Sequence, residues 1–231
     1  MNVGIVFAKG PEKGERNINL YLIEEHPVIY YSINAALSAK KLDKVWVATD
    51  DKNIAEIAEG LSCEVIKRPE EIETMGEEIV YSAREVIKRN SSCKNMVILS
   101  GNNSMVSPYL IEKSVEILER RKEVKSVITV WKARHDSPGC ALMIRNGFLG
   151  PFLEKDTEEE VYFYDGSVIA IRSEVIENKC FKDERWWSKL PNCVPLVRPW
   201  PTGRDIHDSY GLSLARWWLK NAPVDTAGEV K

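Results

Sequence analysis

The sequence predicts an α/β protein with a largely parallel sheet that is covered by helices on both faces. Short apolar segments alternate with amphipathic helical segments as far as about residue 130, which is typical of strands joined by crossover helices. The apolar segments show no polar alternation, and this indicates strands that are buried on both faces. Polar or glycine-containing turns follow several of them, as expected where such strands end.

Most of the elements are expected in this first part of the chain. The strands are expected at residues 1–8, 45–48, 63–66, 96–99 and 126–131. The helices are expected at residues 27–41, 54–60, 77–89 and 108–118. Pro27 favours the first turn of the first helix. Asp50 or Asp51 can cap the second helix with a side-chain oxygen, and Gly60 is expected to end it.

The second half of the sequence changes character. Antiparallel strands are expected at residues 140–145 and 162–172, with a polar stretch at 146–160 between them. Residues 186–201 are rich in Pro and Trp and are expected to be irregular segments that cover the sheet. A final helix is expected at residues 209–220.

Length and composition suit one soluble domain without a membrane span. We expect a single domain over residues 1–231 with an insertion around 135–200. The net charge of −3 argues against a nucleic-acid-binding surface. No apolar run approaches the ~20 residues that cross a bilayer. Five cysteines at irregular spacings fit a reducing cytoplasm better than a disulfide framework.

The segment directly after the first strand has the composition of a phosphate-binding loop. Gly10 and Gly14 allow main-chain amides to approach an anion closely. Lys9, Lys13 and Arg16 can neutralise several negative charges. The spacing matches neither a Walker loop nor Gly-x-Gly-x-x-Gly. The loop alone leaves two interpretations open, a phosphate site and a solvated surface turn.

Three turns are expected at one edge of the sheet. Residues 9–17, 49–51 and 100–104 each follow the carboxyl end of a predicted strand. Ligands of open α/β sheets bind at this edge, where the strand order reverses. The ligand site is therefore expected between these turns.

Several segments, taken in order, resemble the CMP-N-acetylneuraminate synthetases and related sugar cytidylyltransferases. Residues 8–17 are similar to the opening signature A-R-G-G-S-K-G-I-P-x-K-N, shortened by two residues. Residues 27–37 are similar to K-P-L-I-x-Y-x-I-x-A-A-L, and residues 47–55 are similar to V-S-T-D-D-x-x-I-A. Residues 68–71 fall where the family has R-P-x-E-L, and residues 164–171 are similar to its later N-G-A-I-Y strand. The resemblance covers most of the chain in order and spacing.

This resemblance implies a three-layer αβα sandwich with a Rossmann-like, mostly parallel sheet of the nucleotide-diphospho-sugar transferase type and a small antiparallel insertion. It implies attack by the hydroxyl of an acidic sugar or related small anionic acceptor on the α-phosphorus of CTP, with release of pyrophosphate and with Mg²⁺ as cofactor. By the same resemblance, Lys9 is expected to take the place of the loop arginine, and Lys13 is expected to contact phosphate and stabilise charge at the α-phosphorus. The other residues that the resemblance places at the nucleotide are Ala8, Gly10, Gly14, Arg16, Asn17 and Arg68.

The candidate metal ligands come from two places. Asn102, with the glycine before it, is similar to the Gly-Asp of other nucleotidyltransferases, in which the aspartate binds metal; a neutral Asn102 is the weaker ligand. Residues 205–209 resemble the D-I-D-T stretch, whose carboxylates hold Mg²⁺. Either Asp205 and His207 occupy the paired positions or Asp208 is the surviving aspartate, and we favour Asp205 together with Asp208. In the alternative interpretation, Asp208 or Ser209 caps the last helix.

Three departures from the family pattern leave a second function open. Glu12 replaces the loop serine, and Met75 stands where the family usually has an aspartate. Residues 99–106 replace L-Q-P-T-S-P-L-R, so that the glutamine and arginine associated with substrate are lost. These losses motivate the alternative of a catalytically inactive, nucleotide-binding regulatory or scaffold protein of the same fold.

The resemblance also bears on the acceptor and on assembly. Arg134, Arg145, Arg172 and Arg198 lie in the half in which the family binds its acidic sugar, and guanidinium groups suit a carboxylate. Similar enzymes pair through a segment of this half, so a homodimer through part of residues 146–184 is expected.

Overall fold

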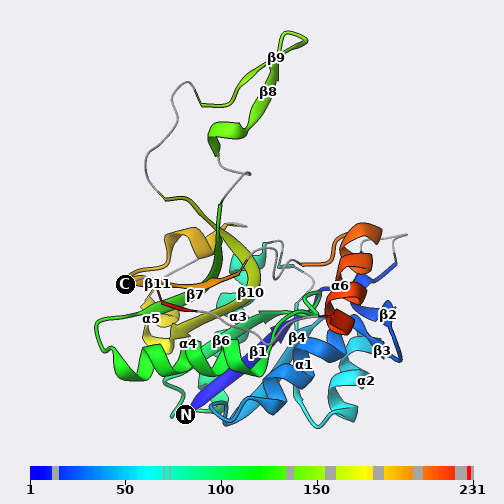
Figure 1. Ribbon diagram of the computed structural model, residues 1–231. Coiled ribbons are helices and arrows are strands. Elements are labelled where there is room, and N and C mark those ends of the chain that lie inside the picture. The colour runs from blue at the N-terminus through cyan, green and yellow to red at the C-terminus, as the bar shows by residue number, and fades with distance from the viewer. Residues whose placement is uncertain are drawn as a thin grey trace.

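The computed structural model describes residues 1–11, 16–69, 71–72, 74–133, 138–153, 160–178, 185–199, 205–221 and 228–229. Helices cover both faces of a central eight-stranded sheet in a three-layer arrangement (Figure 1). The predicted fold class, a mostly parallel αβα sandwich with a small antiparallel addition, is confirmed.

The sheet has the strand order β12-β11-β7-β10-β6-β1-β4-β5. Its strands are β1 (Asn2–Phe7), β4 (Lys44–Thr49), β5 (Glu64–Lys67), β6 (Asn95–Ser100), β7 (Ser126–Lys132), β10 (Tyr162–Arg172), β11 (Cys193–Arg198) and β12 (Gly228–Glu229). β1 is parallel to β4 and β6, β4 to β5, and β7 to β11. β10 runs antiparallel to β6 and β7, and β12 to β11. The carboxyl ends of β1, β4 and β6 therefore meet at one edge.

The helices divide into two layers. They are α1 (Val28–Ser38), α2 (Lys52–Gly60), α3 (Met75–Arg89), α4 (Pro108–Arg120), α5 (Ser173–Asn178) and α6 (Ser209–Asn221), with short 3₁₀ turns η1 (Ile18–Leu20), η2 (Pro138–Cys140) and η3 (Trp186–Lys189). Val6 of β1 belongs to the core beneath α1, α2 and α4. Ile5 and Phe7 belong to the core of the other face, with α3, α5 and Trp186. Because alternate residues of a strand point to opposite faces, one short strand supplies both cores.

Local signals fix where the helices begin. Asp51 caps α2, since its Oδ1 accepts hydrogen bonds from the amides of Asn53 at 2.8 Å and Ile54 at 3.2 Å. This confirms a capping role for one of the two aspartates after β4. Thr74 and Glu77 form a reciprocal capping box, so α3 starts two residues before the predicted 77. α1 is shorter than the predicted 27–41 because Pro27 is its N-cap and the backbone is extended again just after Ser38.

The second half differs from the prediction in its strand pairing. The segment expected at 140–145 forms β8 (Leu142–Arg145), which pairs with β9 (Phe148–Pro151) rather than with β10. Asn146 and Gly147 between them have positive φ values of 53° and 84°, as a two-residue hairpin turn requires. The β8–β9 hairpin extends away from the body of the molecule (Figure 1). β10 instead enters the main sheet between β6 and β7.

A strand also occurs where irregular structure was expected. β11 lies within residues 186–201 and pairs in parallel with β7 along its whole length. Pro195 argues against a strand because it has no amide hydrogen to donate. On its other side, however, β11 pairs with β12 at Leu196 and Val197, so no described strand faces Pro195 there. A second small sheet joins β2 (Leu22–Ile23) to β3 (His26–Pro27).

Within the described residues, no helix combines the length and the hydrophobicity that a bilayer crossing requires.

Candidate active site

The loops after β1, β4 and β6 meet at one edge of the sheet, as predicted. The amide of Ala8 donates to the carbonyl of Ala48 at 3.0 Å, and the amide of Gly101 donates to the carbonyl of Phe7 at 2.7 Å. A fourth segment joins them, because the amide of Ile206 donates to the carbonyl of Asn102 at 2.9 Å. This segment leads into α6 and carries the candidate metal ligands.

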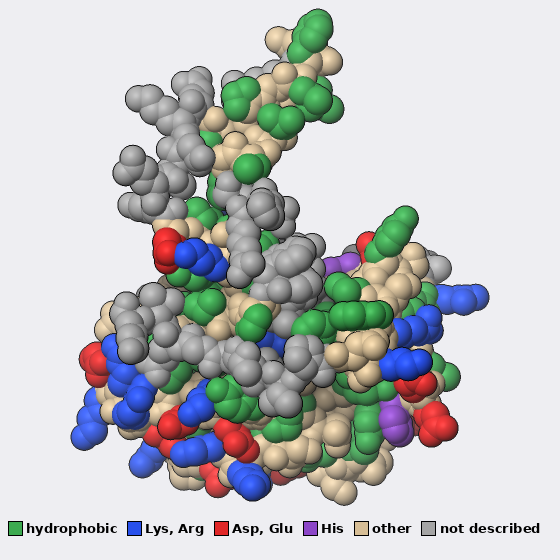
Figure 2. Space-filling model, viewed as in Figure 1, with side chains coloured by type: hydrophobic (Ala, Val, Ile, Leu, Met, Phe, Trp, Pro, Cys, Tyr) green, Lys and Arg blue, Asp and Glu red, His purple; other side chains and the backbone are tan. Residues whose placement is uncertain are grey.

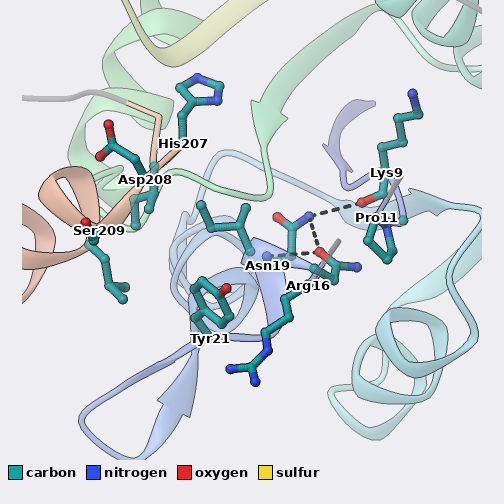
Figure 3. A pocket seen from close by; sticks show the side chains of 13 residues that line it. Lys9, Pro11, Arg16, Asn19, Tyr21, His207, Asp208 and Ser209 are labelled. Atoms are coloured by element: carbon teal, nitrogen blue, oxygen red, sulfur yellow. Dashed lines mark hydrogen bonds between the residues drawn. The ribbon is translucent and has the colours of Figure 1, made fainter. Parts of the chain in front are cut away.

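A cavity of about 590 Å³ opens between the first loop and the start of α6. Lys9 and Pro11 lie on one side of it, and Asp208 and Ser209 lie on the other (Figure 3). The predicted residues Lys9, Gly10, Arg16 and Asn17 line the cavity, together with Pro11, Ile18, Asn19, Tyr21, Ile206, His207, Asp208, Ser209 and Leu212. Its shape and cations suit a phosphorylated ligand.

Three of the sequence-predicted loop residues are not among the described residues that line the cavity. Lys13 and Gly14, like the departure Glu12, lie outside the described residues. Ala8 is buried behind the loop and packs against Gly101, where an added Cβ would lie 2.8 Å from that of Ala8. Ala8 therefore supports the loop from behind.

Two consecutive carboxylates hold the described ends of the first loop. Asp50 accepts a hydrogen bond from the amide of Gly10 at 2.6 Å. Asp51 accepts one from the side chain of Asn17 at 2.8 Å. Asn19 closes the arrangement, because its side chain donates to the carbonyl of Lys9 at 3.2 Å and to Asn17 Oδ1 at 3.1 Å. The loop is thus anchored to the end of β4.

Arg68 reaches this loop through Asp50. Its Nη1 lies 2.7 Å from Asp50 Oδ2, and its Nε lies 3.3 Å from a carboxylate oxygen of Glu78. Nη2 donates to the carbonyl of Ile72. Arg68 is buried and does not line the 590 Å³ cavity. The structure shows Arg68 holding Asp50, the carboxylate that anchors the loop, and its place near the nucleotide stays a prediction.

Asp205 is a carboxylate in dense surroundings, and within the described residues it has no lysine or arginine partner. The side chain of Asn103 donates to its Oδ1 at 3.5 Å, and no described lysine or arginine forms an ion pair with it. The residue as a whole is partly exposed, but protein atoms surround its carboxyl closely. This burial, with a further contribution from the Asp165 carboxylate, raises the pKa of Asp205 to about 7. The charged form of Asp205 therefore needs a counter-charge.

Gly166 allows the backbone of β10 to approach Asp205. Its φ is +74°, a conformation that favours glycine. An added Cβ would lie 2.4 Å from Asp205 Oδ1. The glycine is therefore required both by its backbone conformation and by the neighbouring carboxylate.

Asp165, the residue before this glycine, has a buried partner of its own. Arg198 Nη1 lies 3.0 Å from Asp165 Oδ2 and donates to Ser167 Oγ at 2.6 Å. Thr129 donates to Asp165 Oδ1 at 2.5 Å. Burial still raises the pKa of Asp165, while Arg198 acts in the opposite direction. Of the two neighbouring carboxylates, Asp165 thus has a buried cationic partner, whereas Asp205 has none among the residues that the structure describes.

Of the four arginines, one or two of which are expected to meet a carboxylate or phosphate, Arg172 and Arg198 contact groups of the protein itself. Arg198 has no exposed side-chain surface and is held by Asp165. Arg172 donates through Nε to the carbonyl of Val124 at 2.8 Å and through Nη2 to that of Leu118 at 2.6 Å. Both guanidinium groups support the fold. Arg134 and the side chain of Arg145 lie outside what the structure describes.

Asp208 and Asn102 have local structural roles at the same place. Asp208 Oδ1 accepts from the amide of Gly211 at 2.7 Å, which is the helix-capping alternative for this residue. Asn102 donates from its side chain to the carbonyl of Ile206 at 3.1 Å and so holds the segment next to Asp205. Asp205, His207 and Asp208 together line a further cavity of about 390 Å³. Asp208 thus lies beside the site as a helix cap, and metal binding by Asp208 stays a prediction.

The sequence analysis missed Asn103, Asp165 and Gly166. Gly166 and Asp165 lie in the segment matched to the N-G-A-I-Y strand, so a signal for them was present. Asn103 lies in the predicted turn at 100–104, but its role had no signal, because its contacts with Asp205 and with Ser167 join residues far apart in the chain.

Comparisons with known proteins agree with this arrangement. A family model described as cytidylyltransferase matches residues 4–139. An N-acylneuraminate cytidylyltransferase of Escherichia coli is 24% identical over 135 residues, which are 58% of this chain and 32% of that protein. A CMP-N,N'-diacetyllegionaminic acid synthase of Legionella pneumophila is 25% identical over 204 residues, covering 83% of this chain and 87% of that protein. The chain thus spans about a third of the length of the N-acylneuraminate cytidylyltransferases that it matches.

Solved structures share the fold. A CMP:2-keto-3-deoxy-manno-octonic acid synthetase complexed with CTP superposes with a TM-score of 0.71 at 16% identity, covering 95% of this chain and 98% of that one. A 4-diphosphocytidyl-2C-methyl-D-erythritol synthase from Anaerococcus prevotii superposes with a TM-score of 0.69 at 13% identity, covering 95% and 96%. At these identities the likeness concerns the fold.

Proposed function

Because the chain belongs to the cytidylyltransferase family, we propose that it transfers the cytidylyl group of CTP to a hydroxyl of an acidic sugar or related small anionic acceptor. The acceptor oxygen forms a bond to the α-phosphorus while the bond from that phosphorus to the bridging oxygen breaks, and pyrophosphate leaves. One observation carries the proposal. The cation-bearing loop after β1 and the uncompensated Asp205 segment face the same edge of the sheet, where the three loops meet.

The triphosphate is proposed to bind in the 590 Å³ cavity. Lys9 and Arg16 would neutralise its charge, and Gly10, which lines the cavity without a side chain, would leave room for a phosphate. Lys13 is proposed to stabilise charge at the α-phosphorus, with Gly14 shaping the same loop. Such transfer needs mainly positioning and electrostatic stabilisation. The anchoring of the loop by Asp50 and Asp51 supports that requirement, because it holds the described loop ends in one place.

Asp205 fits the role of a ligand for Mg²⁺. A divalent cation would supply the counter-charge that this carboxylate lacks among the described residues. Within the same described residues, no three His, Cys, Asp or Glu side chains gather in a group able to hold a metal. Mg²⁺ commonly uses one or two carboxylates and completes its shell with waters and substrate phosphates. We propose Asp205 as the principal protein ligand, with Asp208 and Asn102 beside it.

When bound, the metal would neutralise charge on the phosphates of CTP. The protein groups do the rest. Asn103 orients Asp205, Gly166 leaves room for its carboxyl, and Asn102 holds the following residue in place. Arg198 forms an ion pair with Asp165, so that Asp205 is the carboxylate of this pair that would bind the metal.

We also propose that the protein is a homodimer through the β8–β9 hairpin. Leu142, Ile144, Phe148 and Leu149 are 62–78% exposed on it, and apolar side chains gather along the extended hairpin in Figure 2. A two-stranded hairpin of this kind is marginally stable alone, and exposed apolar patches favour association. A cytoplasmic location is proposed as well, supported by Cys63 and Cys193, which form no disulfide.

The test is pyrophosphate release in the presence of Mg²⁺. CTP is compared with ATP, GTP and UTP over a panel of sugar acids and phosphorylated sugars. We expect turnover with CTP, and we expect Lys13→Ala or Asp205→Asn to abolish it. CTP binding by calorimetry without turnover on any acceptor would instead favour the inactive scaffold alternative, which neither the family match nor the structural neighbours support.

A further inference from the structure

A separate cavity of about 210 Å³ lies on the face of the sheet covered by α3 and η3. It opens at the ends of β1, β6 and β10, which are neighbours in the sheet (Figure 1). Its lining includes Met75, Ser100, Tyr164, Trp186, Trp187 and Asp205. Asp205 therefore borders both this cavity and the cavity of about 390 Å³ that His207 and Asp208 also line.

Most of this lining is apolar. Tyr164 and Trp187 contact each other with ring centroids 5.0 Å apart. Trp186 is buried, whereas Trp187 is half-buried and Met75 is 40% exposed, so two apolar side chains can meet a ligand. The polar side-chain groups of the lining residues are the Ser100 and Tyr164 hydroxyls, the Asp205 carboxylate and the indole N–H groups of Trp186 and Trp187, and no described lysine or arginine contributes.

Two departures from the family pattern meet in this cavity. Met75 stands where an aspartate is usual, and Ser100 stands at the position of the glutamine in L-Q-P-T-S-P-L-R. The two positions lie on different elements, at the start of α3 and the end of β6. Ser100 is a smaller polar side chain than glutamine, and Met75 has no charge, so both changes reduce the polar surface of the same wall. Two changes in the same direction at one cavity are expected if the protein binds a less polar ligand there. Independent losses of function would not be expected to meet at one wall.

We propose that this cavity binds an aliphatic substituent of the acceptor, such as an alkyl or acyl group, with the reacting hydroxyl directed toward Asp205. This inference rests on the proposed function and adds a substrate class to it. Most hydroxyls of a polyhydroxylated group would lie against the apolar and aromatic side chains of this cavity without a hydrogen-bond partner, which disfavours such a group. An aliphatic group buries its surface there at no such penalty.

Binding can be tested without catalysis. The protein contains five methionines, at residues 1, 75, 96, 105 and 143. In the full chain labelled with ¹³C-methyl methionine, butan-1-ol is titrated as an aliphatic probe and glycerol as a polar probe of similar size. We expect a saturable shift of the Met75 methyl resonance with butan-1-ol and none with glycerol. The methyl groups of Met96 and Met105, buried elsewhere, serve as internal controls.

Turnover supplies the second test. Two acceptors are compared that differ in one substituent, a methyl group in one and a hydroxymethyl group in the other. Met75→Asp, which restores the usual family residue, is expected to lower kcat/KM for the methyl acceptor relative to the hydroxymethyl acceptor by about tenfold or more. Met75→Leu keeps an apolar wall and is expected to retain the preference. An acidic residue at the first position of α3 favours the helix, so Met75→Asp should remain folded.

The two tests separate the two ideas. No saturable response at Met75, or an equal response at all five methyl groups, would overturn the inference even if the protein turns over CTP. A response at Met75 with no turnover on any acceptor would overturn the proposed function and leave an apolar binding cavity. Equal kcat/KM ratios in wild type and Met75→Asp would contradict the assignment of the cavity to the acceptor.

Discussion

Replacement of Asp205 by asparagine is expected to stabilise the metal-free protein above pH 7. In the folded chain, burial and the neighbouring Asp165 raise the pKa of Asp205 from 3.8 to about 7. In the unfolded chain the carboxyl returns to its ordinary pKa. Between these two values the folded state holds a proton that the unfolded state has lost, so the free energy of unfolding falls as the pH rises from about 4 to about 7.

The magnitude follows from this difference. About three pKa units at ~1.4 kcal/mol each correspond to about 4 kcal/mol. Because the residue is partly exposed, solvent screening reduces the effect. We expect Asp205→Asn to raise the free energy of unfolding by about 2–4 kcal/mol at pH 8 and by less at pH 5.

Urea unfolding in EDTA at pH 5 and pH 8 measures this effect. Asp208→Asn is the matched control, since asparagine caps a helix about as well as aspartate and Asp208 is exposed at the start of α6. The control should show no gain that grows with pH. A variant Asp205→Asn no more stable than wild type at pH 8, or equally stabilised at both pH values, would refute the reasoning.

Three further predictions concern the surroundings of the site. Arg68→Gln leaves the carboxylates of Asp50 and Glu78 without their buried partner and should lower the free energy of unfolding by ~3 kcal/mol. The KM for CTP should rise because the loop after β1 loses its anchor. An unchanged melting temperature would contradict this prediction. Gly166→Ala places a side chain on a left-handed backbone and against Asp205, so the free energy of unfolding, measured by thermal unfolding, should fall by about 1–3 kcal/mol. Metal-dependent turnover should be lost as well, and full activity would argue against the close approach of Gly166 to Asp205. Phe148→Asp should convert the proposed dimer into a monomer in sedimentation velocity, because the exposed apolar face of the hairpin is interrupted; a dimer that persists would place the interface elsewhere.

Local signals made the first half of the fold predictable. Buried strands such as β6 and the helix caps depend on neighbouring residues, so the aspartates after β4 indicated a cap before any fold was known. The T-x-x-E pattern at Thr74 was equally local but was overlooked, which moved the predicted start of α3.

Strand pairing in the second half depended on tertiary contacts. β11 was not predicted because Pro195 argues against a strand. The sequence does not show that the neighbouring strand β12 pairs only with residues after Pro195. The apolar side chains of β8 and β9 were not distinguishable from those of a strand in the main sheet. Their turn at Asn146 and Gly147 was the available signal for a separate hairpin.

The candidate site was predictable as a location and less so as a set of roles. The loop, Arg68, Asn102 and Asp205 were all singled out, and the structure brings them to one edge. The sequence does not show whether an arginine contacts a ligand or a buried carboxylate. Arg198 and Asp165, for example, are far apart in the chain and come together only when it folds.

A crystal structure of the protein with CTP and Mg²⁺ tests the central claim most directly. We predict triphosphate density against the loop after β1, between Lys9 and Arg16, with the metal bound to Asp205. Triphosphate bound elsewhere, or a bound CTP whose metal does not contact Asp205, would contradict the account.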